Sequence, residues 1–223
     1  MKRTIVLSAC LLAGMSSVAG AQDHRWEFGA TGGYTLSDGV SGQAILAGDG
    51  NIYDTIGPKD SASFGLSLGY FVNETTEVSF EFNRQASTLE VSGTRTREIG
   101  DMNVDGYHGV FTYHFGESDA AVRPYLSLGL GATTISNISF IDVSGRAREI
   151  NGETRFAGNL GLGLKMYPNN GKFGLKLGAK WTPTYIKSDP GGYWCDPYWG
   201  CYVVGNAQYM NQFEFAGGVS LRF

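Results

Sequence analysis

The sequence predicts an all-β protein, an eight-stranded antiparallel up-and-down β-barrel that crosses a membrane. Three observations lead to this prediction. Apolar and polar residues alternate through eight separate segments, the connections between them are alternately short and long, and the last segment ends on the aromatic Phe223. A period of two is typical of strands with two different faces. Alternating short turns and long loops are typical of membrane barrels.

The first 21 residues have the pattern of a secretory signal peptide. Lys2 and Arg3 form a positive start, residues 4–13 are apolar, and residues 19–21 read Ala-Gly-Ala. We expect cleavage there, leaving residues 22–223 as the barrel. Residues 7–10 also match a lipobox that would lipidate Cys10, but the apolar run continues past it, which favours the signal peptide. Removing both cations would take the net charge from −4 to −6, so no nucleic-acid partner is expected.

Eight segments of the remaining chain show the strand pattern. In residues 61–71, for example, Phe64, Leu66 and Leu68 alternate with glycines and serines. No run of eighteen apolar residues follows the signal segment, which excludes helical spans. A mean hydropathy of −0.13 fits a barrel, because only alternate strand residues face lipid. The predicted strands are 24–34, 61–71, 76–83, 104–115, 123–134, 153–167, 172–186 and 213–223.

The connections predict two different ends of the barrel. The short turns are 72–75, 116–122 and 168–171, and the long loops are 35–60, 84–103, 135–152 and 187–206. Aromatic residues near the strand ends predict two belts at the membrane interfaces. The expected short-turn belt is Trp26, Phe71, Phe115, Tyr125, Tyr167, Phe173 and Phe223. The expected opposite belt is Tyr34, Tyr107, Trp181 and Tyr185.

A soluble β-sandwich or lipocalin-like barrel would also alternate apolar and polar residues. Three features favour the membrane. The apolar faces are uniformly large while the opposite faces are small or charged, the charges lie at strand centres, and a Phe ends the last strand. A soluble protein of this kind would place its apolar face inward instead.

With these features the chain resembles the small outer-membrane β-barrel proteins of Gram-negative bacteria, the group of the OmpA transmembrane domain, OmpX and opacity-type surface antigens. The resemblance rests on the signal segment, the stretch 123–131 and the last strand. It implies a monomer in the outer membrane, contact with lipid and lipopolysaccharide, periplasmic termini, and recognition of the last strand by the barrel-assembly machinery. The expected assembly signal is Phe213, Phe215, Val219, Leu221 and Phe223.

The polar faces of the strands carry charges of both signs, which would point into the lumen. An eight-stranded barrel has an interior just wide enough for side chains to fill, and buried charges must be paired. We therefore predict a salt-bridged plug. The alternative is a narrow pore that selects solutes by charge, since inward glycines leave room for water. The predicted lumen network is Arg25, Glu27, Glu77, Glu81, Lys165, Lys176, Lys180, Glu214 and Arg222.

Catalytic and metal sites are not indicated, and no cofactor is expected. His108 and His114 fall on the inward row but lack an adjacent Ser, so a lipid A-modifying enzyme with a hydrolase triad is the weakest of the functional hypotheses. Four acids of the first long loop do not have the spacing of an EF-hand calcium site. These are Asp38, Asp49, Asp54 and Asp60.

The last long loop contains Cys195 and Cys201, an even pair that in an exported chain favours a disulfide. Its aromatic residues suit a surface that contacts a partner, or they lie at the membrane interface or pack over the barrel mouth. These are Trp194, Tyr198, Trp199 and Tyr202. The sequence thus favours a non-enzymatic, surface-exposed structural or interaction protein of the adhesin or opacity kind. A small passive channel is the alternative.

Overall fold

The computed structural model describes residues 25–46, 52–117, 120–141, 147–168, 172–186, 193–196, 200–203 and 208–223. The expected signal segment and its cleavage site lie outside these ranges. In the described part of the chain, no helix has the length and apolar character needed to cross a membrane.

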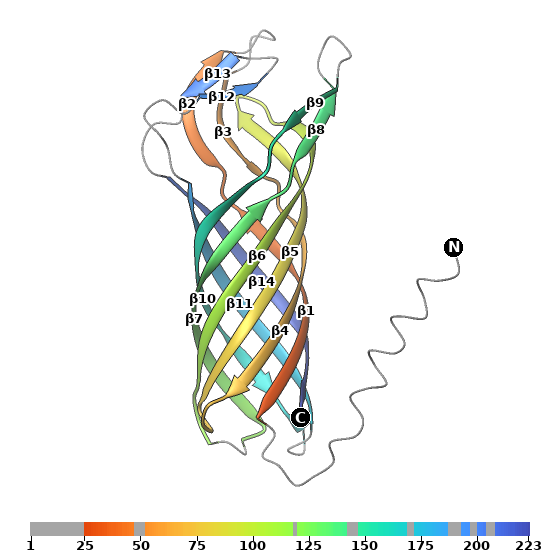
Figure 1. Cartoon of the computed structure of the whole chain (residues 1–223), viewed down its shortest axis with the longest axis vertical. Coiled ribbons are helices and arrows are strands. Elements are labelled where there is room, and N and C mark those ends of the chain that lie inside the picture. The colour runs from red at the N-terminus through yellow and green to blue at the C-terminus, as the bar shows by residue number, and fades with distance from the viewer. Residues whose placement is uncertain are drawn as a thin grey trace, which may run out of the picture.

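Eight strands form a closed antiparallel barrel (Figure 1). Each pairs with the barrel strands before and after it, and the pairing of the first with the last closes the ring. Closure leaves no sheet edge with unpaired backbone groups, which a membrane requires. The predicted eight-stranded fold is confirmed. The barrel strands are β1 (Trp26–Ser37), β4 (Ser61–Phe71), β5 (Thr76–Gly93), β6 (Arg97–His114), β7 (Val122–Ile135), β10 (Glu153–Met166), β11 (Phe173–Ile186) and β14 (Gln208–Arg222).

The outward face of the barrel is apolar over most of its length. Leu128, Leu162 and Phe173 expose 62%, 61% and 72% of their surface, which water would disfavour and lipid would not. The ten residue steps from Phe213 to Phe223 rise about 34 Å along the last strand, or about 25 Å along the axis at a tilt of about 40°. That height matches the apolar band of membrane barrels.

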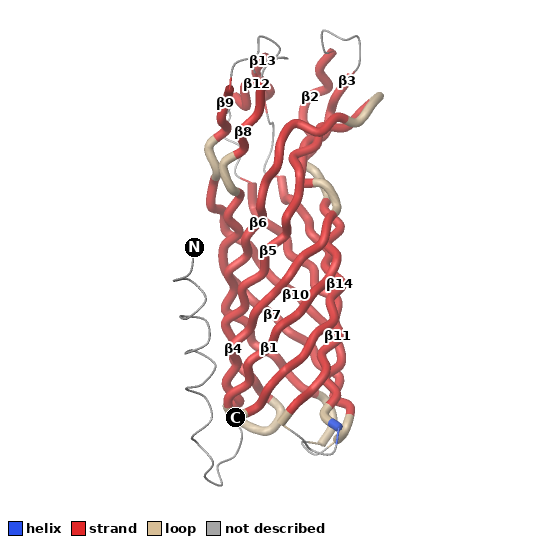
Figure 2. The backbone as a smooth tube through the Cα atoms, turned by 90° about the vertical axis from the view of Figure 1, so that its right-hand side faces the viewer, coloured by secondary structure: helices blue, strands red, loops and turns tan. Residues whose placement is uncertain are grey.

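The long connections contain more strand than the sequence analysis expected. β5 and β6 continue as a hairpin through most of the predicted loop 84–103. Two further strands, β2 (Val40–Leu46) and β3 (Ile52–Pro58), extend the barrel wall, because β3 pairs with β5 beyond the end of β4. Two short hairpins complete this end, which Figure 2 shows opposite the C-terminus. They are β8 (Ile138–Ile141) with β9 (Ala147–Ile150), and β12 (Tyr193–Asp196) with β13 (Gly200–Val203).

The missed half of β5 has a physical explanation. Up to Phe82 its outward residues are apolar and its inward residues are polar. From Arg84 onward the outward residues are mostly polar, and the inward Leu89 and Val91 are buried apolar side chains. The two-residue period continues but its polarity inverts, as expected where a strand leaves lipid and enters water. The predicted strand 76–83 ends at this inversion, because the apolar outward row stops there.

The prediction of the short-turn aromatic belt was wrong for three rings. Phe71, Tyr125 and Tyr167 are buried inside the barrel, because each follows an outward residue of its strand by one position. The other predicted members are exposed, namely Trp26, Phe115, Phe173 and Phe223. The four aromatics of the opposite belt, Tyr34, Tyr107, Trp181 and Tyr185, are also exposed.

Candidate functional site

The side chains in the lumen form layers along the barrel axis. Every fourth residue of β5 contributes one inward side chain to a layer. Its inward side chains include Glu77, Glu81, Gln85 and Leu89, from the short-turn end to the long-loop end. Residues four apart on a strand lie on one face about 13 Å apart. The interior therefore consists of two charged layers, an amide layer and an apolar layer.

The first charged layer is centred on Lys165. Its Nζ lies 2.6 Å from Glu27 Oε1 and 2.6 Å from Glu77 Oε2. Arg222 Nε donates to Glu27 Oε2 at 3.1 Å, and His114 Nε2 lies 2.9 Å from Glu77 Oε2. These five side chains come from five strands. The network therefore connects opposite walls of the barrel across the lumen.

Aromatic rings fill the space around this network. The Tyr167 hydroxyl donates to Glu27, and the Arg222 guanidinium lies 3.6 Å from the Tyr167 ring centroid and 4.7 Å from that of Phe71. Arg123 is also buried, with its Nη2 donating to the Glu74 backbone oxygen at 2.5 Å. The rings assigned to the lipid interface instead pack with the ion pairs inside. Charges and rings thus pack together in the first layer.

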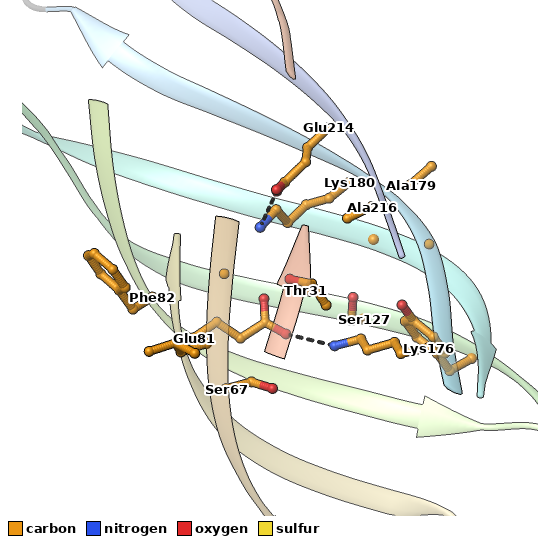
Figure 3. Close-up of a pocket in the computed structure, with 15 residues that line it drawn as sticks. Thr31, Ser67, Glu81, Phe82, Ser127, Lys176, Ala179, Lys180, Glu214 and Ala216 are labelled. Atoms are coloured by element: carbon orange, nitrogen blue, oxygen red, sulfur yellow. Dashed lines mark hydrogen bonds and ion pairs between the residues drawn. The ribbon is translucent and has the colours of Figure 1, made fainter. Parts of the chain in front are cut away.

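The second charged layer holds two separate ion pairs (Figure 3). Lys176 Nζ lies 3.4 Å from Glu81 Oε1, and Lys180 Nζ lies 2.7 Å from Glu214 Oε2. Ser63 Oγ donates to Glu214 at 2.8 Å. The cavity beside them measures about 50 Å³, which is room for roughly one or two water molecules.

Several glycines in the wall make room for a tyrosine ring. A Cβ at Gly178 would lie 2.5 Å from Tyr125 Oη, and one at Gly163 would lie 2.7 Å from the same ring. A Cβ at Gly174 would likewise collide with the Tyr167 ring. At Gly163 and Gly174 the expectation that inward glycines leave room for water is therefore wrong, whereas Gly178 also lines the small cavity. They permit close packing.

The amide layer was not anticipated, since it carries no charge. Gln212 Nε2 donates to Gln85 Oε1 at 2.6 Å, and Gln85 Nε2 donates to Ser37 Oγ at 3.1 Å. Thr184 Oγ1 donates to Thr133 Oγ1 at 3.0 Å on another part of the wall. The alternation of side chains along each strand places these residues on the inward face, and this was the only signal for them in the sequence. They form the last polar level before the apolar mouth.

Arg25 is the one member of the predicted charge network that the structure places elsewhere. It is exposed, and its Nη1 donates to the Tyr70 hydroxyl at 3.4 Å. It precedes the first residue of β1, so strand parity does not fix its direction.

The two inward histidines do not form a hydrolase site within the described residues. His114 contacts Glu77, and neither ring nitrogen of His108 has a hydrogen-bond partner there. Within the same residues no cluster of three metal-binding side chains occurs, and Asp49 lies outside them. Asp60 Oδ1 instead accepts a hydrogen bond from the Ser37 backbone at 2.7 Å.

The long-loop end carries the cysteine segment. Cys195 and Cys201 are direct partners in the register of β12 and β13, and Trp194 is opposite Tyr202. Tyr198 and Trp199 lie outside the described residues. On the wall at the long-loop end, Lys59 Nζ donates to Glu98 Oε1 at 2.5 Å, a contact that raises the pKa of the Lys59 ammonium.

The last strand lies at the seam of the barrel. The Phe223 N–H donates to the Trp26 carbonyl at 2.9 Å, and the Trp26 N–H donates to the Phe223 carbonyl at 3.1 Å. The expected assembly residues Phe213, Phe215, Val219 and Phe223 are exposed on the outward face, and Leu221 is half-buried.

Comparisons with known proteins agree with this architecture. A curated relative, outer membrane porin F of Pseudomonas aeruginosa, is 33% identical over 114 residues, which is 49% of this chain and 28% of that protein. The chain thus spans well under half of that relative's length. Two crystal structures share the fold. Neisserial surface protein A has a TM-score of 0.52 at 16% identity, covering 89% of this chain and 97% of that chain. OprG of Pseudomonas aeruginosa has a TM-score of 0.54 at 15% identity, covering 89% and 96%.

The family comparison covers nearly the whole sequence. The model of the outer membrane protein beta-barrel domain matches residues 7–223, which include all eight barrel strands. The closed ring, the apolar outer face and the polar lumen are the features that this domain requires. The chain therefore belongs to the outer membrane protein beta-barrel domain family.

Proposed function

We propose that the protein is a non-enzymatic outer-membrane barrel that does not conduct solutes and acts through its long-loop end, facing the outside of the cell. The observation that carries this proposal is the position of Lys165 between Glu27 and Glu77. This triad spans the lumen and is packed with rings, so a hydrated solute has no path through the first layer. What the barrel can offer a partner is then its outer face and its long-loop end.

Solute flux into liposomes tests the closed lumen. We expect the refolded wild-type barrel to admit no small sugars or amino acids above the rate of empty liposomes. A general porin reconstituted in parallel shows that the assay detects flux. Folding is verified by the altered mobility of the unboiled protein on an SDS gel. Size-limited flux from folded protein would contradict the proposal.

A small passive channel is the second candidate, and the cavity in the second charged layer favours it. This cavity is lined by Glu81, Lys176, Lys180 and Glu214, so a conducting path would carry fixed charges. In that case Lys176→Gln and Glu81→Gln would shift the preference between anions and cations in opposite directions. In a closed barrel neither variant produces flux.

We further propose that a disulfide joins Cys195 and Cys201 and stabilises a contact surface that includes Trp194 and Tyr202. Directly opposed residues in an antiparallel pair have Cα atoms about 4.5–5.5 Å apart, within the range that a disulfide spans. The aromatic residues suit the anchors of a protein interface. A pinned hairpin would lose less conformational entropy when a partner binds.

The cysteine pairing predicts that the exported protein has no alkylatable thiol until it is reduced. Mass spectrometry after alkylation, with and without reductant, measures this. Reduction is also expected to increase proteolysis between residues 187 and 206. The variant Cys195→Ser/Cys201→Ser should show the faster proteolysis without reductant. Two free thiols in the exported, non-reduced protein would exclude the disulfide.

The partners implied by the family resemblance are also proposals. Outer-membrane lipid and lipopolysaccharide would contact the apolar face, and the barrel-assembly machinery would recognise β14 through its outward aromatic residues. The protein would act as a monomer, with both termini periplasmic. The exposed Phe213 and Phe215 and the seam contact of Phe223 support the role of the last strand.

A further inference from the structure

Beyond the amide layer, the interior of the barrel becomes apolar. Five buried side chains form one cluster there, with six partly buried ones packed against it. The two groups come from strands on most of the barrel wall. The buried residues are Leu89, Met102, Val104, Ile138 and Met210. The partly buried residues are Val40, Ile56, Ile99, Ile135, Ile150 and Ile186.

This apolar layer is not completely filled. It borders a cavity of about 210 Å³, whose lining includes Leu89, Met102, Ile138 and Met210. Protein interiors are packed like organic crystals, and voids larger than a water molecule are few. A cavity of about 150 Å³ with a comparable lining stays dry and binds benzene or xenon. The cavity here is of similar size and its inner lining is likewise apolar, while its rim is polar and partly open.

The polar groups around the cavity define which ligands fit. Asp54 and Glu153 belong to its lining, and Glu153 is paired with Arg155. Among the described residues the lining contains carboxylates but no cation, so a fatty-acid carboxylate would meet Asp54 without a cation in that lining to pair with. On the other side, the bonded pair Gln85 and Gln212 separates the apolar layer from the charged layers. A molecule in the cavity therefore has an apolar wall, a polar rim and no exit through the lumen.

We propose that this cavity, which we call the mouth cavity, binds one small uncharged apolar molecule of about six to ten carbon atoms, somewhat larger than benzene. The binding is driven by removal of apolar surface from water. This goes beyond the proposed function, because it gives the long-loop end a small-molecule site separate from the cysteine hairpin.

The methionines of the protein provide a direct test. Met102 and Met210 line the mouth cavity, whereas Met166 lies on the outward face of β10, near the short-turn end. Full-length protein labelled with ¹³C at the methionine methyl groups is placed in lipid nanodiscs and titrated with toluene. We expect saturable shifts at Met102 and Met210. Met166 should report only the partitioning of toluene into lipid.

Two variants with the same substitution sharpen the test. Leu89→Phe places a ring in the mouth cavity and should weaken toluene binding at least tenfold. Leu162→Phe makes the same change on the lipid face and should leave binding unchanged. If Leu89→Phe does not fold, Ile138→Phe takes its place, since it lines the same cavity.

Three results would overturn the proposal. In the first, Met102 and Met210 respond no earlier than Met166, as expected if protein side chains or a lipid chain already fill the cavity. In the second, the cavity-filling variant binds toluene as well as the wild type does. In the third, hexanoate at neutral pH gives the same saturable shifts as toluene, so the uncharged class of ligand is wrong.

Discussion

Replacing Lys165 by Met is expected to lower the free energy of unfolding by about 3–5 kcal/mol, the usual cost of removing one partner from a buried ionic network. Lys165 is the only side chain seen between Glu27 and Glu77 in the described network, and both carboxylates are buried. Without the ammonium, two buried like charges remain close together among aromatic rings.

Urea unfolding in detergent micelles, followed by tryptophan fluorescence, measures this loss. Lys172→Met is the matched control, because Lys172 is exposed beside a short turn and should cost little. Adding Glu77→Gln to Lys165→Met should recover part of the stability, since it removes one of the two repelling charges. Equal stability of Lys165→Met and Lys172→Met would show that water reaches the first layer and that the plug is not closed.

Leu128→Arg is expected to destabilise the barrel by about 2–4 kcal/mol in lipid vesicles, the cost of an arginine at the middle of a bilayer. Leu128 is near the middle of the outward face of β7 and is 62% exposed. On a protein in water, a charge at such an exposed position would cost almost nothing.

The control for this prediction lies on the same strand. Thr134 is an outward residue opposite Asp105, beyond the apolar band. Thr134→Arg should cost about 0–1 kcal/mol. Urea titration of both variants in the same vesicles gives the comparison. Similar losses for the two variants would mean that the exposed apolar face is not in lipid.

Much of the fold follows from the sequence because alternation and turn length act locally. The strand expected at 61–71 is β4 with the same bounds. The charges that parity places inward, such as Glu81 and Lys176, do meet across the lumen. Alternation gives the direction of a side chain without any knowledge of its partner.

What the sequence did not reveal depends on contacts between distant strands. Tyr167 was assigned to the interface from its place near a strand end, yet its partner is Glu27, from the other end of the chain. His114 and Gln212 could not be placed in networks because no local pattern identifies their partners. The apolar mouth was missed for another reason, because the predicted strand stops where the outward residues change from apolar to polar. The outward pair of Arg84 and Asp105, 2.6 Å apart, marks this change and is the local sign that lipid has ended.

The seam between β1 and β14 also has a consequence for the order of folding. β1 is made first among the barrel strands, but one of its two neighbours is the last strand of the barrel. Until that neighbour arrives, one edge of β1 has unpaired backbone groups, each costing several kcal/mol in hydrocarbon. The growing chain therefore cannot complete the barrel strand by strand in lipid. Insertion and closure must coincide, and an open sheet needs protection until then.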